Sequence, residues 1–198
     1  MATLGGQVNQ FLGKTRFVVC RVFLQLSGAE IIPLLGLLNR VTRKAIESQG
    51  DLQTLGEGLV EVCQNLLQYG LYWQAAANEG DVIWDANEAA DYVDELFTDS
   101  AQRYLANPSL IAAAEETLTV PISENLVVML VVASEGEVPA LETDLADLEA
   151  MEEGLKAMIN LHYQQRLRAI QIHFSPARLG DELTDDQLLQ NFPELIPL

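Results

Sequence analysis

The sequence predicts an α/β protein of the α+β kind, in which a mixed β-sheet of about four strands is packed by several helices. Two apolar runs carry most of this prediction, because TRFVVCRVFLQL at 15–26 and NLVVMLVVAS at 125–134 have the continuous hydrophobicity of buried strands. Between and after these runs, apolar residues recur at helical spacing. The chain ends in a capped helix and an apolar tail, which we expect to dock on the core.

The composition is that of an ordered protein that can bury a substantial core. Hydrophobic residues make up 49% of the 198 residues and charged residues 20%, which argues against disorder. We expect a flexible segment at 1–14 and a single α/β domain at 15–198, with a helical region at 28–106 and a strand–helix–strand unit plus C-terminal helix at 120–198. No apolar run is long enough to span a membrane and no secretory signal is visible, so the expected location is the cytoplasm.

The charge of the chain is strongly negative and unevenly distributed. The formal net charge is −18, with basic residues concentrated in 1–48 and acids dominating 49–160. A field of this sign repels phosphate backbones, so the sequence argues against a nucleic-acid partner. We interpret the acidic middle of the chain as a solvated surface.

A strand followed by a helix is expected at the start of the domain. One face of the strand carries Val18, Cys20, Val22, Leu24 and Leu26, and the other carries Phe17, Val19 and Phe23. This strand is therefore predicted to be interior and covered on both sides. Ser27 and Glu30 have capping-box spacing, and the helix that they open is expected to run to about Gly50. Pro33 must lie in the first turn of this helix or kink it.

The next part of the chain holds a second helix and an ambiguous segment. The helix is expected at about 51–69, although Gly56 and Gly58 weaken its start. The segment 71–84 is compatible either with an extended stretch containing a turn at 78–81 or with a loose hairpin. Both interpretations stay open at the level of the sequence.

Two further helices have clear start signals. Asp85 and Glu88 open a helix that reaches about residue 105. Near the C-terminus, Thr184 and Gln187 form another capping box, and a proline ends the helix that follows. The apolar residues of the tail are expected to lie on the core as a strap: Phe192, Leu195, Ile196 and Leu198.

The unit at 125–175 is predicted to be strand, helix, strand. A continuous helical stripe of apolar residues is expected from Leu141 to Ile159. The second strand alternates, with Gln171 and His173 on its outward face. If the two strands are neighbours and parallel, their connection should be right-handed.

No catalytic motif is visible, and we expect a protein without enzymatic activity. His162 and His173 have no companions at metal-ligand spacing, and the acids at 181–186 lack the pattern of a calcium loop, so no metal is expected. The glycines match no phosphate-binding motif, so no cofactor is expected either. Cys20 and Cys63 are interpreted as reduced, buried residues.

Two features are candidates for binding. Tyr72, Trp73 and Trp84 form the one aromatic concentration outside a clear helix. Such clusters occur in interfaces, but they more often anchor a loop to the core, and we prefer the core interpretation. Gly136 follows the central strand at a place where α/β sheets bind ligands, although the two adjacent glutamates should repel an anion.

Several stretches form a recognisable set: Tyr72-Trp73, the strand NLVVMLVVAS, the strand ending at 173–176, and above all the terminal DELTDDQLLQNFPELIPL with Phe192 and Pro193. This set resembles a domain family of unknown function found in cyanobacteria and chloroplasts, which includes the fluctuating-light acclimation proteins. The resemblance implies a photosynthetic organism and a role in thylakoid regulation through protein contacts. It also implies motif positions at Tyr72, Trp73, Phe192 and Pro193, whose role we interpret as structural.

We therefore expect a regulatory or interaction protein with a protein partner that the sequence does not identify. The alternative is a small-molecule-binding module or an enzyme with a site at the strand ends near Gly136 and Pro176. A third hypothesis is peripheral attachment to a membrane, such as the thylakoid, through Lys14, Arg16 and Arg21.

Overall fold

The computed structural model describes residues 14–105, 125–176 and 181–198. The strands are β1 (Phe17–Ser27), β2 (Trp73–Ile83), β3 (Asn125–Glu135), β4 (Leu167–Ser175) and β5 (Ile196–Pro197). The helices are α2 (Ile32–Glu47), α3 (Leu52–Gln68), α4 (Ala86–Leu105), α5 (Leu148–Tyr163) and α6 (Asp185–Asn191). Except for residue 14, the segment 1–14 that we expected to be flexible lies outside the described residues.

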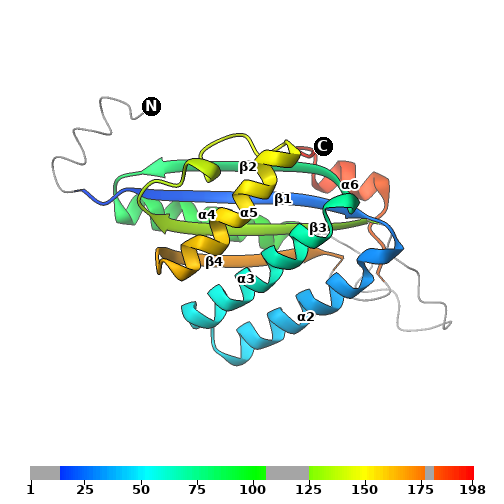
Figure 1. Ribbon diagram of the computed structural model, residues 1–198, viewed down its shortest axis with the longest axis horizontal. Coiled ribbons are helices and arrows are strands. Elements are labelled where there is room, and N and C mark those ends of the chain that lie inside the picture. The colour runs from blue at the N-terminus through cyan, green and yellow to red at the C-terminus, as the bar shows by residue number, and fades with distance from the viewer. Residues whose placement is uncertain (1–13, 106–124, 177–180) are drawn as a thin grey trace.

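The strands form one sheet in the order β4-β3-β1-β2-β5. Helices α2, α3 and α5 cover one face, and α4 covers the other together with α6 (Figure 1). The predicted α/β class is therefore confirmed. The sheet differs from the prediction in having five strands and in being antiparallel at every described pairing, so the expectation of a mixed sheet is wrong.

The predicted unit of strand, helix and strand is present as β3, α5 and β4, but its strands run antiparallel. The segment between β3 and α5 runs back over the face that α2, α3 and α5 cover, and α5 begins only after it (Figure 1). The helix then returns the chain to the end of β3, where Glu135 N–H donates to Arg166 O at 3.0 Å. The predicted helical stripe starts too early for the same reason, because Leu141 and Leu145 are buried in the crossing segment and α5 begins after its N-cap Asp147.

The central strand β1 is buried on both faces, as its sequence predicts. Toward α2, α3 and α5 it places Val18, Cys20, Val22, Leu24 and Leu26 in the largest apolar cluster. Toward α4 and α6 it places Val19 and Phe23 in two smaller clusters. Between these two residues, on the same face, comes Arg21, which is only 3% exposed.

Residues 73–83 form one continuous strand instead of the expected turn or hairpin. Gly80 makes this possible, because its backbone lies so close to β1 that a Cβ atom would be 2.3 Å from Val19 O. The polar residues beside it have tertiary partners, since Asn78 binds the backbone of Thr143 and Glu79 pairs with a buried arginine. These contacts outweigh the local preference of the segment for a turn.

Most of the predicted helix starts are confirmed. The Asp51 carboxylate accepts a backbone N–H in the first turn of α3, and Asp85 does so in α4. The expected capping box of Ser27 and Glu30 is wrong. A short 3-10 turn precedes α2 there, its N-cap is Gly28, and no side chain caps it.

Helix α3 begins at Leu52 and includes both glycines that were expected to weaken its start. A Cβ atom on Gly56 would be 2.2 Å from His162 Nδ1 of α5. A Cβ atom on Gly58 would be 2.7 Å from Val41 Cγ1 of α2. Both glycines therefore allow α3 to pack closely against its neighbours.

The C-terminal tail is docked, as predicted. Thr184 and Gln187 form the capping box of α6. Phe192 is buried and packs edge-on against Phe23, with the ring centroids 6.4 Å apart. The tail then forms β5, a strand that the sequence did not predict, and Ile196 is 51% exposed instead of lying on the core.

Candidate binding groove at the edge of the sheet

The outer edge of β2 is paired over only a short part of its length. β5 pairs with this edge as far as Ala76, and no other strand in the described ranges pairs with it. Leu198 N–H donates to Gln74 O at 3.0 Å, so the even-numbered residues of β2 direct their backbone groups toward β5. We call the stretch Asn78–Ile83, beyond β5, the open edge.

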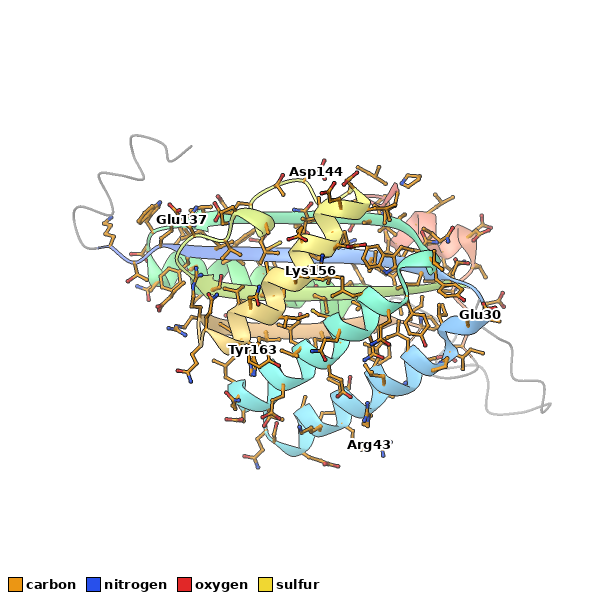
Figure 2. The ribbon with its side chains drawn as sticks, in the orientation of Figure 1. Glu30, Arg43, Glu137, Asp144, Lys156 and Tyr163 are labelled. Atoms are coloured by element: carbon orange, nitrogen blue, oxygen red, sulfur yellow. The ribbon has the colours of Figure 1, made fainter. Side chains whose placement is uncertain are left out.

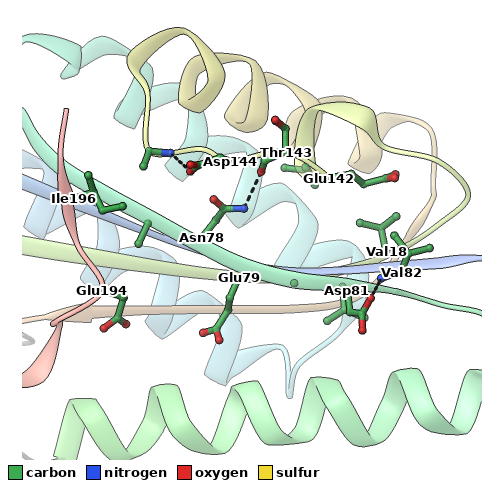
Figure 3. Close-up of a pocket in the computed structure, with 15 residues that line it drawn as sticks. Val18, Asn78, Glu79, Asp81, Val82, Glu142, Thr143, Asp144, Glu194 and Ile196 are labelled. Atoms are coloured by element: carbon green, nitrogen blue, oxygen red, sulfur yellow. Dashed lines mark hydrogen bonds between the residues drawn. The ribbon is translucent and has the colours of Figure 1, made fainter. Parts of the chain in front are cut away.

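Alternation along the strand determines which backbone groups the open edge presents. The register with β1 is regular here, so the N–H and C=O groups of Asn78, Gly80 and Val82 point away from β1. Val82 N–H donates to Asp81 Oδ1 at 2.6 Å, in keeping with this direction (Figure 3). The open edge therefore continues the row of backbone groups that β5 uses.

A groove of about 510 Å³ accompanies the open edge (Figure 3). Its upper wall in this view is the segment 141–146, which the side chain of Asn78 holds in place. Asn78 Nδ2 donates to Thr143 O at 3.0 Å, and Leu145 N–H donates to Asn78 Oδ1 at 2.8 Å. The tail contributes Glu194 to the lining. The wall is thus fixed to the strand by hydrogen bonds.

The groove is acidic, because the side chains that line it include five carboxylates and no basic group: Glu79, Asp81, Glu142, Asp144 and Glu194. Three of these are paired, Glu79 with Arg21, Glu142 with Arg16 and Glu194 with Arg103. Asp81 and Asp144 are exposed and form no ion pair within the part of the chain that the structure describes. In Figure 2, Asp144 lies at the edge of the molecule beside β2, opposite Arg43.

Arg16 anchors the wall of the groove near the start of β1. Its Nη1 atom donates to Glu142 Oε1 at 2.9 Å and to Gly136 O at 3.0 Å, and Val138 N–H donates to the same carboxylate oxygen at 2.7 Å. The hydrogen bond from Arg16 lowers the pKa of Glu142 from its ordinary value, although partial burial opposes the shift. Glu142 therefore stays ionised at neutral pH and keeps its arginine.

Behind the groove, a buried arginine joins β1, β2 and α4. Arg21 Nε donates to Glu79 Oε1 at 2.6 Å, and Arg21 Nη1 donates to Asp99 Oδ2 at 2.5 Å and to Ser100 Oγ at 3.0 Å. Burial alone raises the pKa of Asp99, but the hydrogen bonds and charges of Arg21 and Arg103 outweigh it and hold the pKa below its ordinary value. Asp99 thus remains the anion that a buried guanidinium needs.

Arg103 extends this network to the tail. It donates to Asp99 Oδ2 at 2.8 Å and also to Glu194, a lining residue of the groove. The guanidinium groups of Arg21 and Arg103 lie 4.8 and 5.3 Å from the ring centroid of Phe23, a cation–π arrangement. Arg103 therefore links the tail beside the groove to Asp99, the same carboxylate that pairs with Arg21.

The sequence analysis did not predict the network of Arg21, Arg103 and their carboxylate partners. The alternation of β1 assigns Val19 and Phe23 to a buried face, and Arg21 lies between them with no assigned partner. An arginine in a strand covered on both sides requires anionic partners, and that signal was available. Those partners come from β2 and α4, which no local pattern of β1 identifies.

The four motif positions named from the sequence do not form one site. Tyr72 and Trp73 lie on the face covered by α2, α3 and α5, where Trp73 is buried and its Nε1 donates to Leu66 O at 3.1 Å. Phe192 is buried on the opposite face, and Pro193 after it is exposed. The sheet therefore separates the two pairs, and Trp73 and Phe192 are core residues.

The histidines and cysteines do not gather into another site. His162 is on α5, and His173 is on the edge strand β4, where burial lowers its pKa. Cys20 and Cys63 are free and buried, and burial raises the pKa of Cys20 to about 12. The described residues contain no cluster of histidine, cysteine and carboxylate side chains placed to hold a metal ion.

The ligand position expected at the strand ends is not assembled. Gly136 and Pro176 lie at opposite ends of the antiparallel pair of β3 and β4. The two glutamates expected to repel an anion, Glu135 and Glu137, line a cavity of about 370 Å³ beside Gly136 together with Lys14, Arg16 and Arg166. Arg16 and Arg166 donate to backbone carbonyls at and beside Gly136, so both guanidinium groups already have structural partners.

The basic residues expected to attach the protein to a membrane are largely engaged within the fold. Arg21 is buried, and Arg16 pairs with Glu142, so both guanidinium groups already have partners within the fold. Lys14 alone of the three forms no ion pair in the described ranges. Among the helices in those ranges, none has the length and apolarity needed to cross a bilayer.

By its fold, this chain is an α/β protein whose described strands form a five-stranded antiparallel sheet with helices on both faces. The chain belongs to the family described as "Protein of unknown function (DUF1517)", whose model matches residues 16–198. Membership in a family of unknown function is thereby confirmed. No curated protein and no solved structure matches the chain.

Proposed function

We propose that this protein is a non-enzymatic interaction protein that binds an extended segment of a partner protein along the open edge of β2. The observation that carries the proposal is the pairing of β5. The tail of the chain already adds to this edge as an antiparallel strand, and it leaves the edge beyond Ala76 vacant among the described strands. A partner segment in the groove would continue that addition.

The energetics of strand addition fit the groove. Main-chain hydrogen bonds supply the affinity, and the walls that receive alternate side chains supply the selectivity. At about 3.4 Å per residue, the open edge is about 17 Å long, which suits a strand of ordinary length. The segment 141–146 is already bonded to Asn78, so it does not have to be ordered when a partner binds, and the cost of association is lower.

The substitution Val82→Pro tests the proposal. Proline removes the outward N–H of Val82 and resists pairing, yet proline is tolerated on the free side of an edge strand. The probes are peptides selected by the wild-type protein from a random-sequence phage library. We expect the affinity of these peptides for Val82→Pro to be at least about tenfold lower than for the wild type. Proline has no N–H to donate to the partner strand, and its ring obstructs the approach of that strand.

The control is Leu52→Pro, at the first residue of α3 and far from the groove along the chain. Proline is favourable at this helix position because its N–H has no partner within the helix. We expect both variants to keep the wild-type circular dichroism spectrum and Leu52→Pro to keep peptide affinity within about twofold. Failure to select any peptide, or equal binding by Val82→Pro and wild type, would contradict the proposal.

The C-terminal resemblance supports a cellular setting for this function. We propose that the interaction serves photosynthetic acclimation, with the protein in the cytoplasm or at the periphery of the thylakoid. The support is the terminal pattern DELTDDQLLQNFPELIPL in the printed sequence. Deleting the gene in its source organism should alter chlorophyll fluorescence during changes of light intensity. An unaltered fluorescence response would argue against this setting and leave the binding function to be judged by the peptide assay.

A further inference from the structure

We propose that the partner segment bound at the open edge is basic, with lysine or arginine side chains on both of its faces. This inference rests on the proposed function, because it names the chemistry of the segment that the same groove receives. It is carried by the placement of Asp81 and Asp144 on the two sides of the open edge.

The two aspartates lie on different sides of the plane of the sheet. Odd-numbered residues of β2, such as Ala77 and Ile83, face the α4 side, so Asp81 belongs to that side. Asp144 belongs to the segment that lies on the opposite side, where Asn78 binds it (Figure 3). Successive side chains of an added strand point alternately to these two sides, so each row of side chains meets an aspartate.

Both aspartates have charge available for a ligand. The Oδ1 atom of each accepts a neighbouring backbone N–H, from Val82 at 2.6 Å and from Ala146 at 2.9 Å. Neither forms an ion pair with a basic residue of the described chain. The other three carboxylates of the lining are paired with arginines, so Asp81 and Asp144 are the groups that a cationic side chain would neutralise.

The charge also decides between occupants. A segment rich in acids would meet five carboxylates and no basic side chain in the lining, and a nucleic acid would meet the same repulsion. Another copy of the tail would bring Asp181, Glu182 and Glu194 with it. The parts of the printed sequence outside the described ranges carry one basic residue, Arg178, so they do not supply such a segment, and the occupant that we propose is a segment of a different protein.

The double substitution Asp81→Asn with Asp144→Asn removes charge and preserves structure. Asparagine keeps the Oδ1 acceptor that each aspartate offers to its neighbouring N–H. The matched control is Asp91→Asn with Asp94→Asn, two exposed positions on α4 that form no ion pair among the described residues. Both variants change the net charge equally, so only the groove variant tests local recognition.

The experiment again uses peptides selected from the random-sequence library by the wild-type protein. We expect the selected peptides to be enriched in lysine and arginine, with affinity that falls as salt rises. Neutralising the groove aspartates should weaken binding about fivefold to tenfold, and the α4 control should stay within about twofold.

The outcomes separate this inference from the function on which it rests. Selected peptides that are neutral or acidic but lose binding to Val82→Pro would overturn the inference and keep the function. Basic peptides that bind the groove variant as tightly as the wild type would also overturn it, because overall charge would then explain the enrichment. If no peptide is selected, both proposals fail.

Discussion

Arg21 is the residue on which the α4 face of the sheet is organised. It lies between Val19 and Phe23 in the central strand, and its charge is balanced by Glu79 of β2 and Asp99 of α4. A guanidinium suits this position because it donates to several acceptors at once and stacks on an aromatic ring. One of these partners, Glu79, is also among the carboxylates that line the groove.

Replacing Arg21 with methionine should destabilise the fold by about 2–3 kcal/mol, because Glu79 and the buried Ser100 lose their donor and Asp99 keeps only Arg103. The loss of stability is no larger because the side chains of Glu79 and Asp99 are 45% and 41% exposed, so water can hydrate them when Arg21 is absent. Urea unfolding measures the change. Arg168→Met is the control, because its pair with Glu135 is exposed and should contribute about 0–1 kcal/mol. Equal losses of unfolding free energy in the two variants would show that the buried network stabilises the fold no more than an exposed ion pair does.

At the scale of the element, β2 is shaped by what lies on each side of it. Its inner side packs so closely on β1 that only glycine fits at residue 80. Its outer side receives β5 at Ala75 and Ala76 and is then left to the groove. The polar residues 78–81, which resemble a turn in the sequence, therefore form part of the open edge of β2. Charged side chains on such an edge discourage pairing with the strands of other molecules, and so discourage aggregation.

Gly80→Ala should destabilise the protein by about 2–4 kcal/mol, because the added Cβ would meet backbone atoms of β1 that cannot move independently. Gly36→Ala is the matched control in α2, where an added Cβ has nothing within 4 Å. That variant should be more stable than the wild type by about 0.5–1 kcal/mol, since alanine favours a helix interior. Thermal unfolding distinguishes the two variants, and an unchanged stability of Gly80→Ala would contradict close packing of β2 on β1 at this residue.

At the scale of the whole molecule, the elements were more predictable than their arrangement. Local patterns predicted both faces of β1, the apolar β3, and the caps of α4 and α6, because these depend on residues close in sequence. They did not predict the antiparallel direction of β4, which follows from the path of the segment between β3 and α5. The groove could not be predicted from local patterns either, because its walls come from β2, the segment 141–146 and the tail, which are far apart in the sequence.

The central claim is that a partner strand pairs with the open edge of β2, and the amide of Gly80 reports on it most directly. Gly80 N–H faces the open edge, so its hydrogen exchange can be followed by NMR with and without a saturating selected peptide. We predict that the peptide slows this exchange at least about tenfold, as a new inter-strand hydrogen bond requires. A bound peptide that leaves the exchange of Gly80 N–H unchanged would contradict the account.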